Sequence, residues 1–238
     1  MGGRSREREV SLRSGAAVAK ALSALGFDVV PIDLKGDWAQ AIREARIEVA
    51  FVALHGAWGE DGCVQGLLEI MGIPYTGSGP AASALCMHKR LCKRVLAAHG
   101  VRVPQDMPLQ DGVPVRFPVV IKPVNEGSSI DLAIVSGSDE WKAYAARVRG
   151  APERWLVEER VQGVEVAVGV LEGEALVPVE VRPRRGVYDY TAKYTPGETE
   201  YLCPPKLPAE TIRRCMQVAE EAVRVCGCRG APRVDMIV

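Results

Sequence analysis

Apolar and polar positions over the first 80 residues switch between helical and strand spacing. Apolar residues recur every three or four positions over 11–25, which predicts a helix. Short continuous apolar runs at 29–32 and 49–54 predict strands, and the second run is typical of a sheet covered on both faces. Helical spacing occurs again at 38–45 and 64–71. This alternation predicts βαβ units and a parallel sheet.

The pattern changes after the glycine- and proline-containing loop at 76–80. Helical spacing predicts one long helix over 81–99, and strands and helices then mix in the manner of α+β units. The expected strands are 119–122, 133–135, 155–160, a hairpin of 165–171 with 175–181, and 233–238, and the expected helices are 139–148 and 208–226. Residues 182–205 show no periodicity, and loops of this length in compact proteins are usually functional.

Composition narrows the class of protein. The chain has 238 residues, of which 47% are hydrophobic and 25% charged, as in soluble globular proteins of two or three compact units. Its 30 basic and 30 acidic residues cancel, so we expect no nucleic-acid partner and no membrane partner. The N-terminus has no apolar signal core. The seven cysteines are scattered, and the pair Cys226 and Cys228 is spaced too closely for a usual metal motif, which favours a cytoplasmic location.

The segment Phe-Pro-Val-Val-Ile-Lys-Pro-Val-Asn-Glu-Gly-Ser-Ser at 117–129 is the most informative part of the chain. Lys122 follows a short apolar run that predicts a buried strand, and a small polar turn follows at 126–129. A lysine that faces a loop rich in backbone N–H groups suits a polyphosphate. An ordinary strand followed by a surface turn explains the same residues.

Three other segments combine side chains that suit a ligand, and each has a purely structural alternative. His55 follows an expected strand, where ligands gather in open α/β sheets, or it only ties down a glycine-rich loop. The segment 188–194 suits a lid that excludes water, or an aromatic-anchored surface loop. Arg233 and Asp235 share one face of the last strand, either as an ion pair or as a substrate-binding cation beside a Mg²⁺-binding carboxylate.

Together these segments resemble the D-alanine–D-alanine ligase family of ATP-grasp enzymes, over nearly the whole chain. The motifs are Gly-Gly-Arg-Ser-x-Glu-Arg-Glu-Val-Ser at 2–11, Ala-Leu-His-Gly at 53–56, Gly-Glu-Asp-Gly at 59–62, Gln-Gly-Leu-Leu-Glu at 65–69, Pro-Tyr-Thr-Gly-Ser-Gly at 74–79, Lys-Pro-x-x-Glu-Gly-Ser-Ser at 122–129, Tyr-Asp-Tyr-x-Ala-Lys-Tyr at 188–194 and Gly-Cys-Arg-Gly at 227–230. Each motif is weak alone, and their joint occurrence in this order is highly specific.

The resemblance implies the ATP-grasp fold, of mixed α/β and α+β class. It implies an N-terminal parallel α/β substrate domain at 1–80, a central subdomain at 81–163 and a C-terminal subdomain at 164–238, the last two of which sandwich ATP. The implied reaction joins two D-alanines for peptidoglycan synthesis: ATP phosphorylates the first carboxylate, and the second amine attacks the acylphosphate. The implied cofactors are ATP and Mg²⁺, or Mn²⁺, and a homodimer is compatible with the resemblance.

The resemblance also implies roles for individual residues. The ATP-binding residues are Lys89, Lys122, Glu126, Ser128, Glu158, Glu165 and Lys193, with the lysines on phosphates, Glu158 on the adenine amino group and Glu165 on the ribose. The residues implied for the amino-acid substrate are Glu7, Val10, His55 and Tyr188. The implied catalytic residues are Glu7, Ser128 and Tyr194, which form a hydrogen-bonded triad, and Arg233, which stabilises the oxyanion. Asp235 is the implied metal ligand.

The chain departs from the family pattern at both ends and at three internal positions. Met1 stands where the family has a first strand, and Val238 precedes the second metal carboxylate, a metal-binding asparagine and a glycine–serine–leucine segment. Asp131 replaces a glycine, His88 an aspartate and Glu159 a lysine. We therefore expect a truncated chain whose ligase activity is weak or absent.

Two alternatives to this reaction stay open. One is an ATP-grasp ligase that uses another amino acid, which a screen of D-alanine, D-lactate and D-serine would separate. The other is a non-catalytic nucleotide-binding remnant, which would bind an ATP analogue without turnover.

Overall fold

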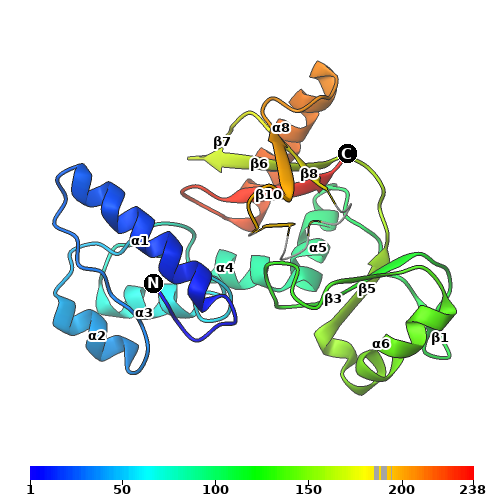
Figure 1. The fold of residues 1–238 in the computed structure, drawn as a ribbon, viewed down its shortest axis with the longest axis horizontal. Helices are drawn as coiled ribbons and strands as arrows, with labels where there is room; N and C mark the ends of the chain where they lie inside the picture. Colours follow the sequence, from blue (N-terminus) through cyan, green and yellow to red (C-terminus); the bar gives the residue numbers. More distant parts are fainter. Residues whose placement is uncertain (185–187, 189–191, 194) are drawn as a thin grey trace. The chain divides into compact units, whose positions relative to one another are not determined.

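The computed structural model describes residues 1–184, 188, 192–193 and 195–238 (Figure 1). The chain divides into two compact units. The first unit is formed by Met1–Met87 with Gly227–Gly230, and the second by His88–Cys226 with Ala231–Val238. No helix in the described part of the chain combines the length and the apolar character that crossing a membrane requires.

The first unit is built on four helices. They are α1 (Arg8–Ala24), α2 (Trp38–Ala45), α3 (Cys63–Met71) and α4 (Pro80–Met87). Helix α2 begins at Asp37, whose carboxylate accepts a hydrogen bond from the backbone N–H of Gln40 at 3.0 Å and so caps the helix. The core of the unit joins α2 and α3 to the segment before α2 and to the segment between the two helices, through Leu34, Ile42, Leu54, Val64 and Leu68.

The two strands expected at 29–32 and 49–54 are wrong. In this part of the described chain the segments make isolated parallel bridges instead, Gly2 with Leu34 and Ala50 with Tyr75. A strand needs a hydrogen-bonded neighbour along its length, and within the described residues the backbone of the first segment is bonded at its end alone, where the carbonyl oxygen of Ile32 accepts from the N-terminal ammonium of Met1 at 2.9 Å. Val30, Val49 and Phe51 are consequently exposed. The direction of both bridges agrees with the parallel arrangement that the alternation predicts.

The single helix expected over 81–99 is also wrong, because the helix is interrupted at His88. The imidazole Nδ1 of His88 accepts a hydrogen bond from the backbone N–H of Leu91 at 3.3 Å. It thereby caps a separate helix, α5 (Lys89–Ala98). This position departs from the family pattern, and here its side chain has a structural task.

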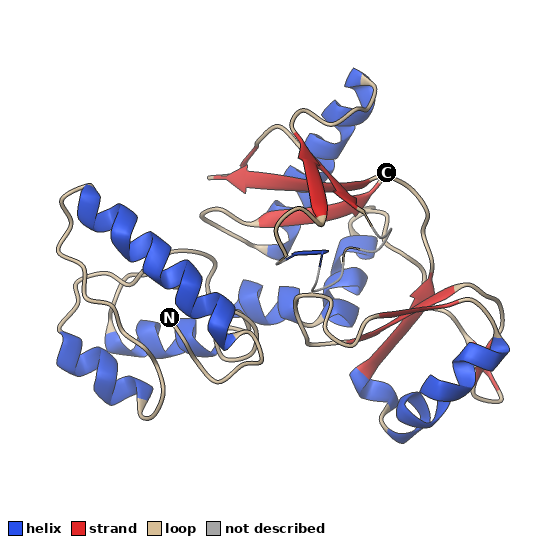
Figure 2. Ribbon diagram, viewed as in Figure 1, coloured by secondary structure: helices blue, strands red, loops and turns tan. Residues whose placement is uncertain are grey.

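The second unit contains two larger antiparallel sheets (Figure 2). The strand order of the first is β4-β3-β5, and that of the second is β10-β6-β8-β9, with β7 paired to β6. The first sheet comprises β3 (Val119–Pro123), β4 (Ala133–Val135) and β5 (Trp155–Glu159), and the second β6 (Glu165–Leu171), β7 (Glu174–Ala175), β8 (Val179–Pro183), β9 (Thr199–Leu202) and β10 (Arg233–Ile237). The other elements are the short pair β1 (Leu109–Gln110) and β2 (Val113–Pro114), α6 (Ser138–Gly150), the 3-10 turn η1 (Pro152–Arg154) and α8 (Ala209–Cys226). The expected hairpin, last strand and two later helices are therefore confirmed.

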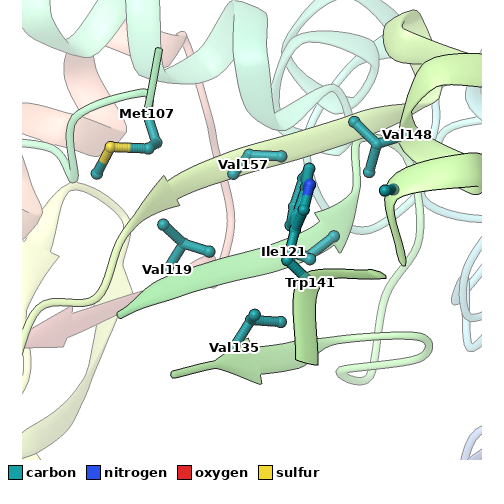
Figure 3. Close-up of a cluster of buried hydrophobic side chains, with 8 residues drawn as sticks. Met107, Val119, Ile121, Val135, Trp141, Val148 and Val157 are labelled. Atoms are coloured by element: carbon teal, nitrogen blue, oxygen red, sulfur yellow. The ribbon is translucent and has the colours of Figure 1, made fainter. Parts of the chain in front are cut away.

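Alternation along β3 gives its sheet one apolar face and one face that carries charge. Val119 and Ile121 are fully buried and pack with Trp141 of α6 and Val157 of β5 (Figure 3). Trp141 is 2% exposed, and its indole N–H donates to the carbonyl oxygen of Gly112 at 2.9 Å. The opposite face of β3 is left for Lys122.

We expect Trp141→Ala to lower the free energy of unfolding by about 3–5 kcal/mol, because it leaves a cavity in this core and an unsatisfied carbonyl. Urea denaturation followed by circular dichroism measures the change. Lys142→Ala, at the next and exposed position of α6, is the control and should change it by less than about 0.5 kcal/mol. A loss below about 1 kcal/mol in Trp141→Ala would contradict this account of the core.

Candidate functional site

Lys122 and Glu158 lie on the face of the first sheet that is turned away from α6. The register pairs Val120 with Glu158 and Lys122 with Leu156, so alternation places both charged side chains on the same face. The Lys122 ammonium forms an ion pair with Oε1 of Glu158, whose side chain is only 4% exposed. The strand predicted at 119–122 is therefore present, and the side chain of Lys122 at its end pairs with a buried carboxylate.

Lys89 brings a second ammonium group to the loop that follows β3. It is the first residue of α5, and its Nζ donates hydrogen bonds to the carbonyl oxygens of Glu126 and, at 3.5 Å, Val124. The pKa of Lys89 is lowered to about 8, chiefly by burial, then by the positive charge of Lys122 and least by that of Lys193, while nearby carboxylates oppose the shift. Lys122 and Lys193 thus both act on Lys89, and positive charge gathered in this way suits a multiply charged anion.

The loop after β3 has an unusual backbone. Ser128, Ser129 and Asp131 have φ angles of 49°, 56° and 56°, which non-glycine residues rarely adopt. The hydroxyl of Ser129 donates to the carbonyl oxygen of Tyr188 at 2.9 Å, so this loop is tied to the long segment near residue 188. Strained backbone of this kind gathers at ligand clamps. Ser129 has no predicted role, because a partner 59 positions away leaves no local signal in the sequence.

The second sheet presents acidic side chains on the face away from α8. Val166 and Val168 of β6 are fully buried, so Glu165 and Ala167 point to the other face, and Ala167 pairs with Asp235 of β10. Burial raises the pKa of Glu165, and the negative charge of Asp235 raises it further. The carboxylate of Asp235 offers the oxygen ligands that a hard divalent cation prefers, so this residue fits a role in holding Mg²⁺.

Arg233 and Asp235 form an ion pair, as one of the two alternatives from the sequence proposed. Arg233 Nε lies 2.7 Å from Asp235 Oδ1, and Nη2 lies 2.9 Å from Oδ2. Both side chains remain more than half exposed, so they stay accessible to a ligand. The pairing therefore leaves the second alternative, a ligand-binding cation beside a metal carboxylate, open.

Tyr188 and Lys193 come from the long segment expected to act as a lid. Lys193 Nζ lies 5.0 Å from the centre of the Tyr188 ring, and the Tyr188 hydroxyl lies 2.9 Å from that of Tyr201. Burial and this hydrogen bond raise the pKa of Tyr188 well above its usual value, so the phenol is neutral near pH 7. Tyr194, the third member of the expected triad, lies outside the described residues.

Three of the four residues implied for the amino-acid substrate lie in the first unit, which is described here by itself, and the fourth, Tyr188, belongs to the second. Glu7 is 4% exposed at the start of α1, and Val10 of the same helix is 6% exposed. A Cβ at Gly56 would lie 2.6 Å from Oε2 of Glu7, so only glycine lets the backbone approach this carboxylate. His55 Nε2 lies 3.3 Å from the hydroxyl of Ser14. Glu7, Val10 and His55 thus share one region of this unit.

Family models match both parts of the chain. Residues 95–238 match the model described as D-ala D-ala ligase C-terminus, and residues 37–78 match the model described as D-ala D-ala ligase N-terminus. Among curated proteins, the D-alanine–D-alanine ligase of Geobacter sulfurreducens is 46% identical over 245 residues, which cover 100% of this chain and 78% of the relative. That of Anaeromyxobacter sp. (strain Fw109-5) is 48% identical over 250 residues, which cover 100% and 80%.

Solved structures give the same result. The D-alanine–D-alanine ligase of Bacillus anthracis superposes with a TM-score of 0.84 at 32% identity, over 100% of this chain and 81% of that one. A structure of the same protein complexed with ATP gives 0.82 at 29% identity, over 100% and 80%. The VanG D-Ala:D-Ser ligase of Enterococcus faecalis gives 0.80 at 28% identity, over 100% and 84%.

The lowered pKa of Lys89 predicts a specific pH dependence of stability. Because the folded pKa is about 8 and the ordinary value is 10.5, the unfolded chain binds more protons between these two values. The contribution of Lys89 to the free energy of unfolding therefore rises with pH through this window. Urea unfolding of wild type and Lys89→Met across the window measures the difference, with Lys142→Met as an exposed-lysine control. Parallel curves for wild type and Lys89→Met would contradict the buried position of this amine.

Proposed function

Because the chain belongs to the D-alanine–D-alanine ligase family, we propose that it joins two D-alanine molecules into D-alanyl-D-alanine with ATP as the phosphoryl donor. The observation that carries the proposal is the cluster of three amines around Lys89, beside the carboxylates of Glu158 and Glu165. A charged cluster of this kind suits a triphosphate attached to a polar nucleoside. The solved relative complexed with ATP supports the choice of nucleotide.

The nucleotide would lie across the charged faces of the two sheets in the second unit. Lys89, Lys122 and Lys193 supply positive charge for the phosphates, and phosphoryl transfer needs little beyond such positioning and charge stabilisation. Glu158 would accept the adenine amino group, and Glu165 would bind the ribose hydroxyls. The backbone N–H groups of the strained loop at Ser128 would approach the phosphates, as the segment around Glu126 suggests from the sequence.

Asp235 would hold Mg²⁺ at the edge of this site. A bound divalent cation neutralises negative charge on phosphate oxygens. Arg233, whose guanidinium rests on Asp235, has donors to offer an oxyanion at the acyl carbon. Releasing Asp235 to a cation would free the guanidinium for that task, so the two residues would act together.

The first amino acid would be held by the first unit. Glu7 is a buried carboxylate that suits a substrate ammonium group, with Val10 and His55 in the same region. Tyr188 and Lys193, with Ser128 and Tyr194, would close over the acylphosphate and keep water from hydrolysing it. We also propose a cytoplasmic location and a homodimeric state, as is common in the family.

A second amino acid other than D-alanine is the main alternative. It is favoured by the structural similarity to a D-Ala:D-Ser ligase, at a TM-score of 0.80. The chain is given ATP and D-alanine as the first substrate, with D-alanine, D-serine or D-lactate as the second, and mass spectrometry identifies the products. The product that forms decides which second substrate is used. If D-serine or D-lactate is preferred as the second substrate, the proposed product is the mixed one and not D-alanyl-D-alanine.

We expect Lys122→Met to weaken binding of the imido analogue of ATP by about tenfold or more, because one phosphate contact is lost while Lys93 still pairs with Glu158. Calorimetry measures binding, and release of phosphate with D-alanine and ATP measures turnover. Lys142→Met, an exposed lysine of the same unit, should behave as wild type. Binding without D-alanine-dependent phosphate release would favour the non-catalytic alternative, and equal binding by Lys122→Met and wild type would contradict the phosphate role.

A further inference from the structure

Lys93 is a buried lysine to which neither the sequence motifs nor the proposed reaction gives a role. It lies one helical turn after Lys89 on α5, so the two side chains share a face of the helix. Its Nζ lies 2.7 Å from Oε2 of Glu158 and 2.6 Å from Oδ1 of Asp106. The side chain is 14% exposed, so this ammonium group is held mainly by the two carboxylates.

The backbone fixes Asp106 beside Glu158. The N–H of Met107 donates to the carbonyl oxygen of Val157 at 2.9 Å, and the N–H of Glu159 donates to that of Gln105 at 2.9 Å. These bonds form an antiparallel bridge between Asp106 and Glu158. The Lys93 ammonium thus lies between two carboxylates whose positions are set by backbone pairing.

The two oxygens of Glu158 have different lysine partners. Oε1 pairs with Lys122, and Oε2 pairs with Lys93. Lys122 has a second task in the proposed function, on the phosphates of ATP, whereas Lys93 is held by Asp106 as well. When Lys122 turns toward phosphate, Lys93 is left as the cation on Glu158. A buried carboxylate without a cation beside it is unfavourable, so the pairing with Lys93 keeps Glu158 in place when Lys122 is engaged elsewhere.

We propose that Lys93, held by Asp106, is a positioning residue for base recognition: it holds Glu158 through Oε2 in the orientation in which Oε1 can accept the amino group of adenine. The inference rests on the proposed function, because it assumes that Glu158 faces the base. A Glu158 turned away from this position would leave the amino group of adenine without its acceptor. Guanine has a carbonyl oxygen at that position, which finds no donor in the carboxylate of Glu158. Lys93 therefore contributes to the preference for adenine over guanine.

The test is the binding of the imido analogues of ATP and GTP, measured by calorimetry in Mg²⁺ buffer. We expect Lys93→Met to weaken binding of the ATP analogue by about tenfold to a hundredfold, because a charge-assisted contact to adenine is lost. Binding of the GTP analogue should weaken much less. The selectivity ratio, which is the affinity for the ATP analogue divided by that for the GTP analogue, should fall accordingly. Lys93→Arg should restore part of the ratio, since it keeps the charge. Asp106→Asn, at a half-exposed position, should lower the ratio by a smaller factor of about three.

The ratio separates a positioning role from a purely structural one. Lys142→Met is the matched control and should keep both the affinity and the ratio of wild type. If Lys93→Met does not fold, as circular dichroism would show, Lys93→Arg and Asp106→Asn carry the same test. Equal weakening of both analogues, or an unchanged ratio in the variants, would overturn the inference while leaving the proposed function intact. A wild-type chain that binds neither analogue would overturn both.

Discussion

The buried carboxylate of Glu158 is the point on which the rest of the site depends. Strand β5 carries it, and β3 and α5 each bring a lysine to one of its oxygens. Charges that leave water cost several kcal/mol each unless they are paired, so these elements are held to one arrangement. The same arrangement places Lys89 at the start of α5 against the loop after β3. A single electrostatic requirement thereby orders the helix, the sheet and the loop of the candidate nucleotide site.

Strand alternation explains how the second unit separates its core from its chemistry. In the first sheet, one face packs Val119 and Ile121 against α6, and the other carries Lys122 and Glu158. In the second sheet, Val166 and Val168 are buried while Glu165 and Asp235 point the other way. In each sheet, one face packs in the hydrophobic core and the other carries charged side chains. The proposed nucleotide site needs both charged faces, since the lysines of one complement the carboxylates of the other.

The sequence predicted well what local pattern determines, and less well what depends on distant partners. The strand before Lys122 and the last strand with Arg233 and Asp235 follow from short apolar runs and alternation, and both are present. The strands at 29–32 and 49–54 did not form, because a strand needs a partner that periodicity cannot supply. The helix break at His88 depends on one side-chain cap. Lys93 was missed because its partner Glu158 lies 65 positions away, although its spacing from Lys89 was visible.

The central claim is that three crowded amines bind a polyphosphate, and proton uptake tests it most directly. Lys89 has a pKa of about 8, so at about pH 8.5 much of it is neutral, and an arriving triphosphate should restore its proton. Calorimetry of the imido analogue of ATP, in two buffers of different ionisation enthalpy, counts protons taken up on binding. The account predicts a fractional uptake in wild type that disappears in Lys89→Met. Binding without proton uptake, or equal uptake by both proteins, would contradict it.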